Sequence, residues 1–326
     1  MSDSVKQLPL PWFETPLVES AVLSKAAGCR IYLKLENLQP SGSFKSRGVG
    51  NLLLSHLKSR QDTSSTPHFY SSSGGNAGLA CVTAAKTLGY PSTVIVPSST
   101  KPHMIEKIKL AGASEVVQHG ATWFEADTYL REQVLPQDKG GVYVPPFDHP
   151  EVWNGNATIA QEVIQQLSAE PDAVVCSVGG GGLFCGIAQG LQGTKTRIAV
   201  VETKGAESLH EAIKAGKLIT LPGIISIATS LGATTVAPKA LEWGLKENVR
   251  SVVVSDEEAC RACVRFAEDE RMLVEPACGA TIALAYEGRL AEAIEGFNQD
   301  SVVVLVVCGG RNVGLEVIEE WKQKYC

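Results

Sequence analysis

Short, continuous runs of apolar, mostly β-branched residues alternate along this chain with segments of helical pattern, and this alternation limits the possible folds more than any other feature. Runs without polar alternation are typical of strands that are covered on both faces. Helices between such strands indicate mainly parallel sheets with helices on both sides, so the sequence predicts a doubly wound α/β fold. The predicted strands are residues 31–35, 69–72, 93–96, 115–118, 142–144, 174–178, 198–201, 252–254 and 302–307, and the clearest helical patterns are residues 19–27, 49–57, 77–88, 104–111, 157–167, 183–191 and 257–268.

The length and the net charge of the chain limit the class of protein to which it can belong. Its 326 residues are enough for two domains, and 44% apolar with 20% charged residues is an ordinary balance for a soluble protein. A net charge of -6 argues against a nucleic-acid partner, which needs a basic face. The longest apolar run, residues 302–308, is far too short to span a membrane. The N-terminus has no signal-peptide pattern, so we expect a cytoplasmic protein.

The nine cysteines are an odd number and lie scattered, mostly in apolar segments such as residues 174–176. This pattern favours reduced cysteines that pack as small hydrophobic residues over a disulfide framework. Cys260 and Cys263 have the C-x-x-C spacing, but no second pair of ligands lies nearby, and a structural zinc site normally needs four ligands.

One lysine lies among small and flexible residues between a predicted strand and a predicted helix, in the run PSGSFKSRG at residues 40–48. Lys45 at such a turn can be a nucleophilic amine, because burial and nearby helix N-terminal N–H groups lower the pKa of an ammonium group. It can also be a solvated surface charge, which is the commoner state of a lysine. Features elsewhere in the sequence are needed to distinguish between these two interpretations of Lys45.

Two glycine-rich loops also follow predicted strands directly and open the next helix. Residues 71–78, SSSGGNAG, combine a backbone that can approach a ligand closely with serine hydroxyls and the Asn76 amide, which suits a carboxylate or a phosphate. The alternative is a capped helix start. Residues 179–182 are four consecutive glycines, whose N–H groups at a helix N-terminus suit a phosphate, the alternative being a flexible turn.

Two further strand ends carry groups that could reach the same edge of a sheet, where α/β folds bind ligands. Cys308, followed by Gly309 and Gly310, ends the most apolar strand, although a buried cysteine is usually inert packing. Glu202 ends another strand and could bind a cation together with carbonyl oxygens, or be solvated. No G-x-S-x-G motif is present, which argues against a serine hydrolase.

In this order and spacing, the four loops resemble those of the fold-type II pyridoxal-phosphate enzymes, and among them the short catabolic L-serine/L-threonine dehydratases. The resemblance runs from Thr15-Pro16-Leu17 to Cys308-Gly309-Gly310 and includes residues 145–148 (PPFD) and 274–280 (VEPACGA). It implies a small substrate-binding domain of residues 46–142 and a large cofactor-binding domain of residues 1–45 and 143–326, with the cofactor in the cleft between them. It also implies a homodimer.

The resemblance further implies a role for each matching residue. Lys45 would carry pyridoxal 5'-phosphate as a Schiff base and, once freed by the substrate amine, remove the Cα proton as the catalytic base. The implied cofactor-binding residues are Phe44, Lys45, Asn76, Gly179, Gly180, Gly181, Gly182, Leu183, Cys308 and Gly309. The implied substrate-binding residues are Ser73, Gly74, Gly75, Asn76 and Ala77. Glu202, Ala206 and Ser208 match a region that binds a monovalent cation such as K⁺ in relatives.

The activity that the resemblance implies is β-elimination from L-serine, L-threonine or both, which gives pyruvate or 2-oxobutanoate plus ammonia. A thiol at the pyridine nitrogen, as Cys308 would supply, makes a weaker electron sink than a carboxylate would and favours elimination. Two alternatives stay open. A serine or aspartate racemase needs a second acid/base opposite Lys45, commonly a serine in the carboxylate loop; Gly74 at the comparable position cannot serve, but neighbouring Ser73 keeps this alternative open. The other alternative is a non-catalytic cofactor-binding homologue, against which the intact Lys45 argues.

Three other features bear on this expectation. Relatives of the liver type carry alanine where this chain has Gly74, which leaves the rate and the substrate preference open. Arg311 stands where relatives usually have a small or amide residue, and the sequence gives it no role. The chain ends soon after its last motif, so we expect no C-terminal regulatory domain and no feedback inhibition by isoleucine.

Overall fold

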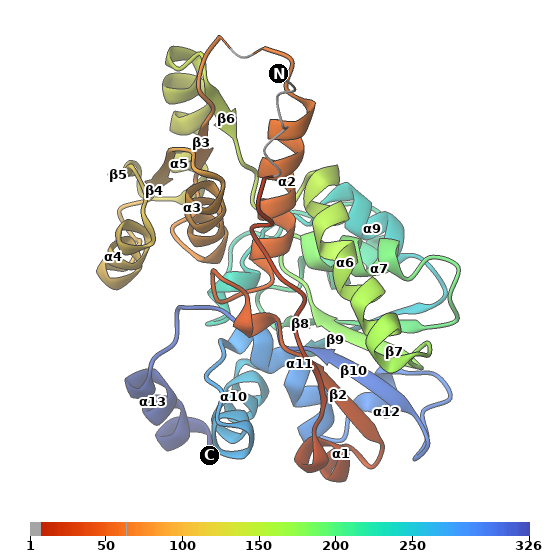
Figure 1. Ribbon diagram of the computed structural model, residues 1–326. Helices are drawn as coiled ribbons and strands as arrows, with labels where there is room; N and C mark the ends of the chain where they lie inside the picture. The colour runs from red at the N-terminus through yellow and green to blue at the C-terminus, as the bar shows by residue number, and fades with distance from the viewer. Residues whose placement is uncertain (1–7, 63) are drawn as a thin grey trace.

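The computed structural model describes residues 8–62 and 64–326, and Figure 1 shows their arrangement. The first seven residues of the predicted large domain, which also belong to the N-terminal stretch used to predict the location, lie outside the described residues. Among the described helices, none combines the length and the apolar character that crossing a membrane requires.

The larger sheet has six strands in the order β1-β2-β10-β7-β8-β9. Neighbouring strands are parallel except at one edge, where β1 pairs antiparallel with β2. The last strand of the chain, β10, lies between β2 and β7, so that Val304 pairs with Tyr32 on one side and with Val174 on the other. The strands are β1 Leu17–Glu19, β2 Arg30–Lys34, β7 Ala173–Ser177, β8 Arg197–Thr203, β9 Val249–Val254 and β10 Val302–Val306.

The smaller sheet has four strands, all parallel, in the order β5-β4-β3-β6. Its strands are β3 His68–Ser71, β4 Ser92–Val96, β5 Glu115–Gln118 and β6 Gly141–Tyr143. The helical segments between them are α3 Asn76–Leu88, α4 Pro102–Ala111, α5 Trp123–Tyr129, the π-helical turn η2 Leu130–Val134 and the 3₁₀ turn η3 Leu135–Gln137. Both sheets alternate with helices along the chain, so the predicted α/β fold with mainly parallel sheets is confirmed.

The remaining helical segments pack around the larger sheet or join it to the smaller one. In Figure 1, α2 runs from the larger sheet toward the four-stranded part and lies alongside α6, and it packs on both α3 and α6. These segments are α1 Ala21–Ala27, η1 Glu36–Leu38, α2 Lys45–Ser59, α6 Pro150–Leu167, α7 Gly182–Gly190, α8 Ser208–Ala215, η4 Thr229–Leu231, α9 Pro238–Gly244, α10 Asp256–Glu270, α11 Pro276–Tyr286, α12 Leu290–Ala293 and α13 Leu315–Tyr325.

All nine predicted strands and all seven predicted helices are present, and every helix start lies within two residues of the prediction except those of α2 and α6. Helix α1 begins after Ser20, whose hydroxyl accepts a hydrogen bond of 3.1 Å from Leu23 N, and the preceding residue ends β1. Helix α6 begins at Pro150, seven residues before the predicted start, because proline suits the first position of a helix. Helix α2 begins at Lys45, four residues before the predicted start.

A buried ion network fixes the start of α2. Arg47 donates hydrogen bonds of 2.7 Å to each carboxylate oxygen of Glu36 and to Glu162, which also accepts a bond of 2.6 Å from Lys34 Nζ. The side chains of Lys34, Glu36 and Arg47 have no exposed surface. Buried charges are tolerated only when they are paired and hydrogen-bonded, so the network ties α2 to β2 and α6 two residues after Lys45.

Candidate active site

Lys45 is the first residue of α2, and hydrogen bonds between two loops hold the turn in front of it. Phe44 N donates to Cys308 O over 3.1 Å, and Gly310 N donates to Gly42 O over 2.9 Å. Gly42 has a φ of +79°, a left-handed conformation that glycine adopts without strain. The structure therefore joins the predicted lysine turn directly to the predicted Cys-Gly-Gly turn.

The amine of Lys45 lies in a sheltered position with a single hydrogen-bond acceptor among the described residues. Its Nζ donates to Pro146 O over 2.6 Å and lies 5.2 Å from the centre of the Phe44 ring. Loss of solvent around the ammonium group lowers the pKa of Lys45 to about 8, and the nearby Cys308 opposes this shift only partly. Lys45 is therefore a half-buried amine that loses its proton near pH 8, which favours the nucleophilic interpretation over the solvated one.

This pKa predicts unusual reactivity. With a pKa of about 8, about half of the Lys45 amine is neutral at pH 8, against less than about 1% of a lysine with the usual pKa near 10.4. We expect trinitrobenzenesulfonate to modify Lys45 first, with a rate that rises with pH up to about 8 and levels off above about 9. Peptide mapping at a series of pH values measures this rate. A Lys45 rate that still climbs steeply above pH 10, as the rate of exposed Lys58 should, would contradict the prediction.

The loop after β3 is shaped by a glycine. Asn76 opens α3, and a Cβ on Gly78 would lie only 1.8 Å from Ser73 O, so no other residue fits there without moving the loop. Beneath the loop, the buried carboxylate of Asp127 accepts hydrogen bonds of 2.7 Å from Ser72 Oγ and from the Tyr143 hydroxyl. These contacts fix the segment that the sequence predicts to bind a carboxylate.

The four consecutive glycines follow β7 and lead into α7, as the sequence predicts. A Cβ on Gly180 would lie 2.3 Å from the Phe147 ring, and a Cβ on Gly181, which has a φ of +95°, would lie 2.5 Å from Ala240 Cβ. Side chains are excluded from both positions by their surroundings. This loop therefore brings bare backbone to the N-terminus of α7, where N–H groups favour an anion.

Cys308 is a buried thiol at the carboxyl end of β10. Its Sγ lies 3.6 Å from Ser177 Oγ, at the end of neighbouring β7. A hydrogen bond shared with the Cys278 thiol, together with burial, raises the pKa of Cys308 well above its ordinary value. Cys308 is therefore a neutral group at the edge where the other loops meet.

Asn76 connects the loop after β3 with the rest of the site. Its Oδ1 accepts a hydrogen bond of 3.0 Å from Arg311 N, and its Nδ2 lies 3.1 Å from Glu275 Oε1 and 3.4 Å from Ser230 Oγ. The next residue, Leu231, packs against Gly179, since a Cβ on that glycine would lie 3.0 Å from Leu231 Cα. Contacts thus link all four predicted loops at one edge of the larger sheet.

Glu202 lies outside this chain of contacts, near the end of β8. Its buried carboxylate accepts hydrogen bonds from Leu209 N (2.8 Å) and His210 N (2.7 Å) at the start of α8. Burial raises the pKa of Glu202 to about 8, although these two hydrogen bonds by themselves would lower the pKa. Nearby, Ser208 Oγ is buried without a hydrogen-bond partner among the described residues.

Three residues of this region were not predicted from the sequence: Thr100, Asp127 and Glu275. Thr100 lies next to Gly74, on which a Cβ would lie 2.7 Å from the Thr100 hydroxyl oxygen. Glu275 could have been predicted as a site residue from its place directly before a proline in an apolar run. Such a run is expected to be buried, as Glu275 is, and buried glutamates are rare. Nothing in the sequence indicates Thr100 or Asp127.

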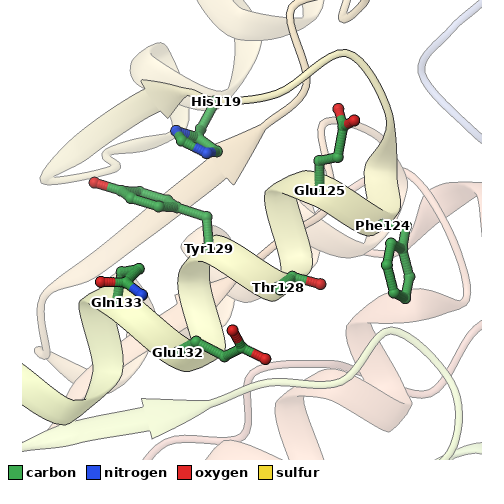
Figure 2. Close-up of a pocket in the computed structure, with 7 residues that line it drawn as sticks. All are labelled: His119, Phe124, Glu125, Thr128, Tyr129, Glu132 and Gln133. Carbon is green, nitrogen blue, oxygen red and sulfur yellow. The ribbon is translucent and has the colours of Figure 1, made fainter.

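A hollow of about 310 Å³ lies elsewhere, on the exposed side of α5, and Figure 2 shows the side chains that line it. His119 and Tyr129 stack there with ring centres 3.8 Å apart, and the Phe124 side chain is exposed. None of the predicted site residues lines this hollow. It is therefore separate from the candidate site.

Comparison with known families and sequences gives consistent matches over nearly the whole chain. The family described as pyridoxal-phosphate dependent enzyme matches residues 8–309. A serine dehydratase-like protein of Rattus norvegicus is 45% identical over 320 residues, which cover 94% of this chain and 93% of the relative. The L-serine dehydratase/L-threonine deaminase of Bos taurus is 43% identical over 323 residues, which cover 95% of each chain.

Solved structures agree with the sequence comparison. A fungal L-serine ammonia-lyase from Rhizomucor miehei superimposes with a TM-score of 0.89 at 34% identity, covering 97% of this chain and 99% of the other. A maize serine racemase superimposes with a TM-score of 0.84 at 26% identity, covering 96% of this chain and 92% of the other. Both the fold and the sequence are thus more similar to the lyase than to the racemase.

Proposed function

The chain belongs to the pyridoxal-phosphate dependent enzymes, and on that premise we propose that it is an ammonia-lyase, which converts L-serine, L-threonine or both into an α-keto acid and ammonia. The observation that carries the proposal is the half-buried Lys45 amine, with a pKa of about 8, at the point where the loops meet. The proposal is supported by relatives named for this activity that align over nearly the whole chain.

The residues present fit pyridoxal phosphate. The Lys45 amine can hold an aldehyde group covalently, and residues 179–182 form a cradle that side chains would fill, where the N–H groups at the start of α7 suit a phosphate. Phe44 supplies an apolar ring next to Lys45, and Cys308 is the nearby neutral thiol. The residues that would hold the cofactor are Phe44, Lys45, Asn76, Gly179, Gly180, Gly181, Gly182, Leu183, Cys308 and Gly309.

The reaction divides between the cofactor and the chain. The chemistry that pyridoxal phosphate supplies when bound is withdrawal of electrons from the substrate Cα. The loop from Ser73 through Gly74, Gly75 and Asn76 to Ala77 receives the substrate carboxylate and so orients the Cα–H bond. Lys45 then takes the Cα proton on Nζ, which its pKa of about 8 allows near neutral pH.

The second half of the reaction breaks the bond between Cβ and the hydroxyl oxygen, which leaves as water; the proton that it takes up is balanced by the one that Lys45 Nζ removed from Cα. The enamine that remains hydrolyses to the keto acid and ammonia. A neutral Cys308 thiol would keep a ring nitrogen protonated less well than a carboxylate would, so the bound ring would withdraw electrons less strongly and departure of the hydroxyl together with the Cα proton is favoured. The site is thus suited to elimination.

A racemase is the second candidate, because a maize serine racemase has the same fold. Racemisation needs a second acid/base on the face of Cα opposite Lys45. Gly74 has no side chain to supply one, and the Thr100 side chain fills the space, with Cγ2 2.6 Å from where a Cβ would stand. The crowding at this position favours the lyase.

Incubation of the cofactor-loaded protein with L-serine and with L-threonine tests the proposal. We expect one keto acid and one ammonia per substrate consumed, measured by reduction of the keto acid with a dehydrogenase and by ammonia assay. Chiral chromatography of the remaining substrate is run in parallel. D-serine forming faster than pyruvate would replace the lyase by the racemase, and the absence of any product would leave a cofactor-binding protein without catalysis.

We further propose that Glu202, Ala206 and Ser208 border a site for a monovalent cation such as K⁺. Support comes from the partnerless Ser208 hydroxyl and from the buried Glu202 carboxylate, which no lysine or arginine side chain pairs among the described residues. Ala206 packs in one cluster with Leu231, so a cation there would stabilise the segment next to the tetraglycine loop.

The raised pKa of Glu202 should make the affinity for this cation depend on pH. Because the carboxyl group keeps its proton up to about pH 8, cation affinity should rise with pH through that range and level off above it. We expect KCl to raise the midpoint of thermal unfolding more than tetramethylammonium chloride does, by a larger margin at pH 9 than at pH 7. Glu202→Gln should remove the difference between the two salts. Equal midpoints in both salts at every pH would contradict the cation site.

We also propose the domain division into residues 46–142 and residues 1–45 with 143–326, a homodimer, and a cytoplasmic location. The strands of the smaller sheet all lie between His68 and Tyr143, which supports the division. Nine free cysteines, eight of them buried, support a reducing compartment. Light scattering after gel filtration should give twice the 34.6 kDa of one chain if the dimer forms.

A further inference from the structure

We propose that Glu275 is the positioning residue of this site. Its carboxylate holds together the first turn of α3, the turn η4 and the loop after β10, and in this way sets where the substrate-binding loop of residues 73–77 lies. The inference rests on the proposed function, because it assigns a task to a residue beside the same loops.

Glu275 binds three segments that are far apart in the sequence. Its carboxylate accepts hydrogen bonds from Asn76 Nδ2, at 3.1 and 3.2 Å from the two oxygens, and from Asn312 N at 2.7 Å. Ser230 Oγ also donates to it. The backbone of Gly310 lies against the same carboxylate, since a Cβ there would be 2.1 Å from Glu275 Cδ. One side chain thus fixes three loops of the site at once.

The environment of this carboxylate is unusual. Glu275 is only 2% exposed, and among the described residues no lysine or arginine side chain pairs with it. It stands at the N-cap of α11 but makes no capping bond to that helix. A buried charge without a cation is costly unless donors surround it, so the energetic advantage of this arrangement depends on the three loops being in place.

Asn76 is held from both ends of its amide. Its Nδ2 donates to Glu275, and its Oδ1 accepts from Arg311 N over 3.0 Å. Reversing the amide would place two donors against each other at Arg311 and two acceptors against each other at Glu275. Because Asn76 directly follows Gly75 and opens α3, this fixed orientation also fixes the end of the substrate-binding loop.

A contact from α4 to the loop after β10 reinforces the bond between Asn76 and Glu275. Lys107, on α4, donates from Nζ to Arg311 O over 2.6 Å. The same loop after β10 is bound to Glu275 through Asn312 N, and a Cβ on Gly75 would lie 3.9 Å from Asn312 Nδ2. Helices α3 and α4, which both cover the smaller sheet, are therefore tied to the larger sheet through a loop that Glu275 holds.

Two substitutions separate charge from packing. Glu275→Gln keeps the shape but replaces one acceptor oxygen by an NH₂ group, which then faces the NH₂ group of Asn76 or the Asn312 N–H. Glu275→Ala leaves all three donors without their acceptor. The matched control is Glu287→Gln at the other end of α11, an exposed residue whose carboxylate is paired with Arg261 at 2.9 Å.

Amide hydrogen exchange of the protein without cofactor or substrate tests the positioning directly. We expect exchange in peptides covering residues 73–82 to be at least about tenfold faster in Glu275→Gln and Glu275→Ala, with peptides of β7 and β8 unchanged. Glu287→Gln should exchange like the wild type. On an Asn76→Ala background, Glu275→Gln should add little further, because the two residues act through one contact.

With cofactor and L-serine, Glu275→Gln should raise KM about tenfold while kcat falls less than about threefold, because binding of the carboxylate depends on the loop and proton removal depends on Lys45. Unchanged exchange at residues 73–82 in Glu275→Gln would overturn the proposal, even if Glu275→Ala fails to fold. A uniform rise of exchange over the whole chain would overturn it as well. The exchange results hold whether or not the wild-type protein turns over L-serine, so they separate this inference from the proposed function.

Discussion

Replacement of Lys45 by alanine should reduce kcat for keto-acid formation by about 10⁴-fold. The change removes the amine that lies where the four loops meet, and with it both the covalent attachment of the cofactor and the base that takes the Cα proton. Production of keto acid and ammonia from L-serine is the measurement. The absorbance of bound pyridoxal phosphate, compared with that of the wild type, reports the loss of covalent attachment independently of turnover.

Lys58 provides the matched control, because it lies on the same helix α2, near its C-terminal end, with its side chain exposed. Lys58→Ala should keep the wild-type rate and the wild-type absorbance. Circular dichroism of both variants shows whether α2 still forms. A Lys45→Ala protein that turns over L-serine at more than about a hundredth of the wild-type rate would refute the role of Lys45 as base.

Replacement of Arg47 by alanine should lower the free energy of unfolding by about 3–5 kcal/mol. The guanidinium group is fully buried and binds both Glu36 and Glu162, so its removal leaves the buried Glu36 carboxylate without a salt bridge and Glu162 with Lys34 alone. Equilibrium unfolding in urea, followed by tryptophan fluorescence, measures the difference. The protein should also bind cofactor more weakly, because the network holds the start of α2 two residues after Lys45.

Two comparisons define this prediction more sharply. Arg30→Ala removes a pair with Glu19 that is exposed on both sides, and it should leave the urea midpoint unchanged. Replacing Arg47 by methionine and Glu36 by glutamine together should recover part of the loss, since the isolated buried charge is then gone. Equal urea midpoints for wild type and Arg47→Ala would show that the network contributes nothing to stability.

The sequence allowed the sheets and most helices to be predicted because their patterns are strong. Strands covered on both faces, such as β7 and β10, are continuous apolar runs, too short for buried helices and bounded by polar or glycine residues. Helix α11 was not predicted, because ten of its eleven residues are buried and no polar face marks its period. Strand β1 was missed for the opposite reason: its three residues are partly exposed, and only pairing with β2 makes them a strand.

Within the site, the loops could be predicted but the connections between them could not. The glycine loops and Lys45 stand out in the sequence because runs of glycines, and a single lysine among small residues, directly follow predicted strands. Asn76 and Glu275 are separated by 199 positions, and their contact depends on how α3 docks against the larger sheet, which no local pattern encodes. The low pKa of Lys45 is likewise a property of its surroundings, since loss of solvent is its main cause.

The position of β10 has a consequence for how the protein is made. This strand leaves the ribosome after all the other described strands, yet it must enter the middle of the larger sheet, between β2 and β7. Until it does, both of those strands present unpaired edges, and nascent chains with such edges tend to pair with one another. Because Cys308 and the backbone that anchors the lysine turn arrive with β10, the nascent chain can complete its catalytic centre only after β10 has left the ribosome. A ribosome stalled before residue 302 would carry a chain that depends on chaperones.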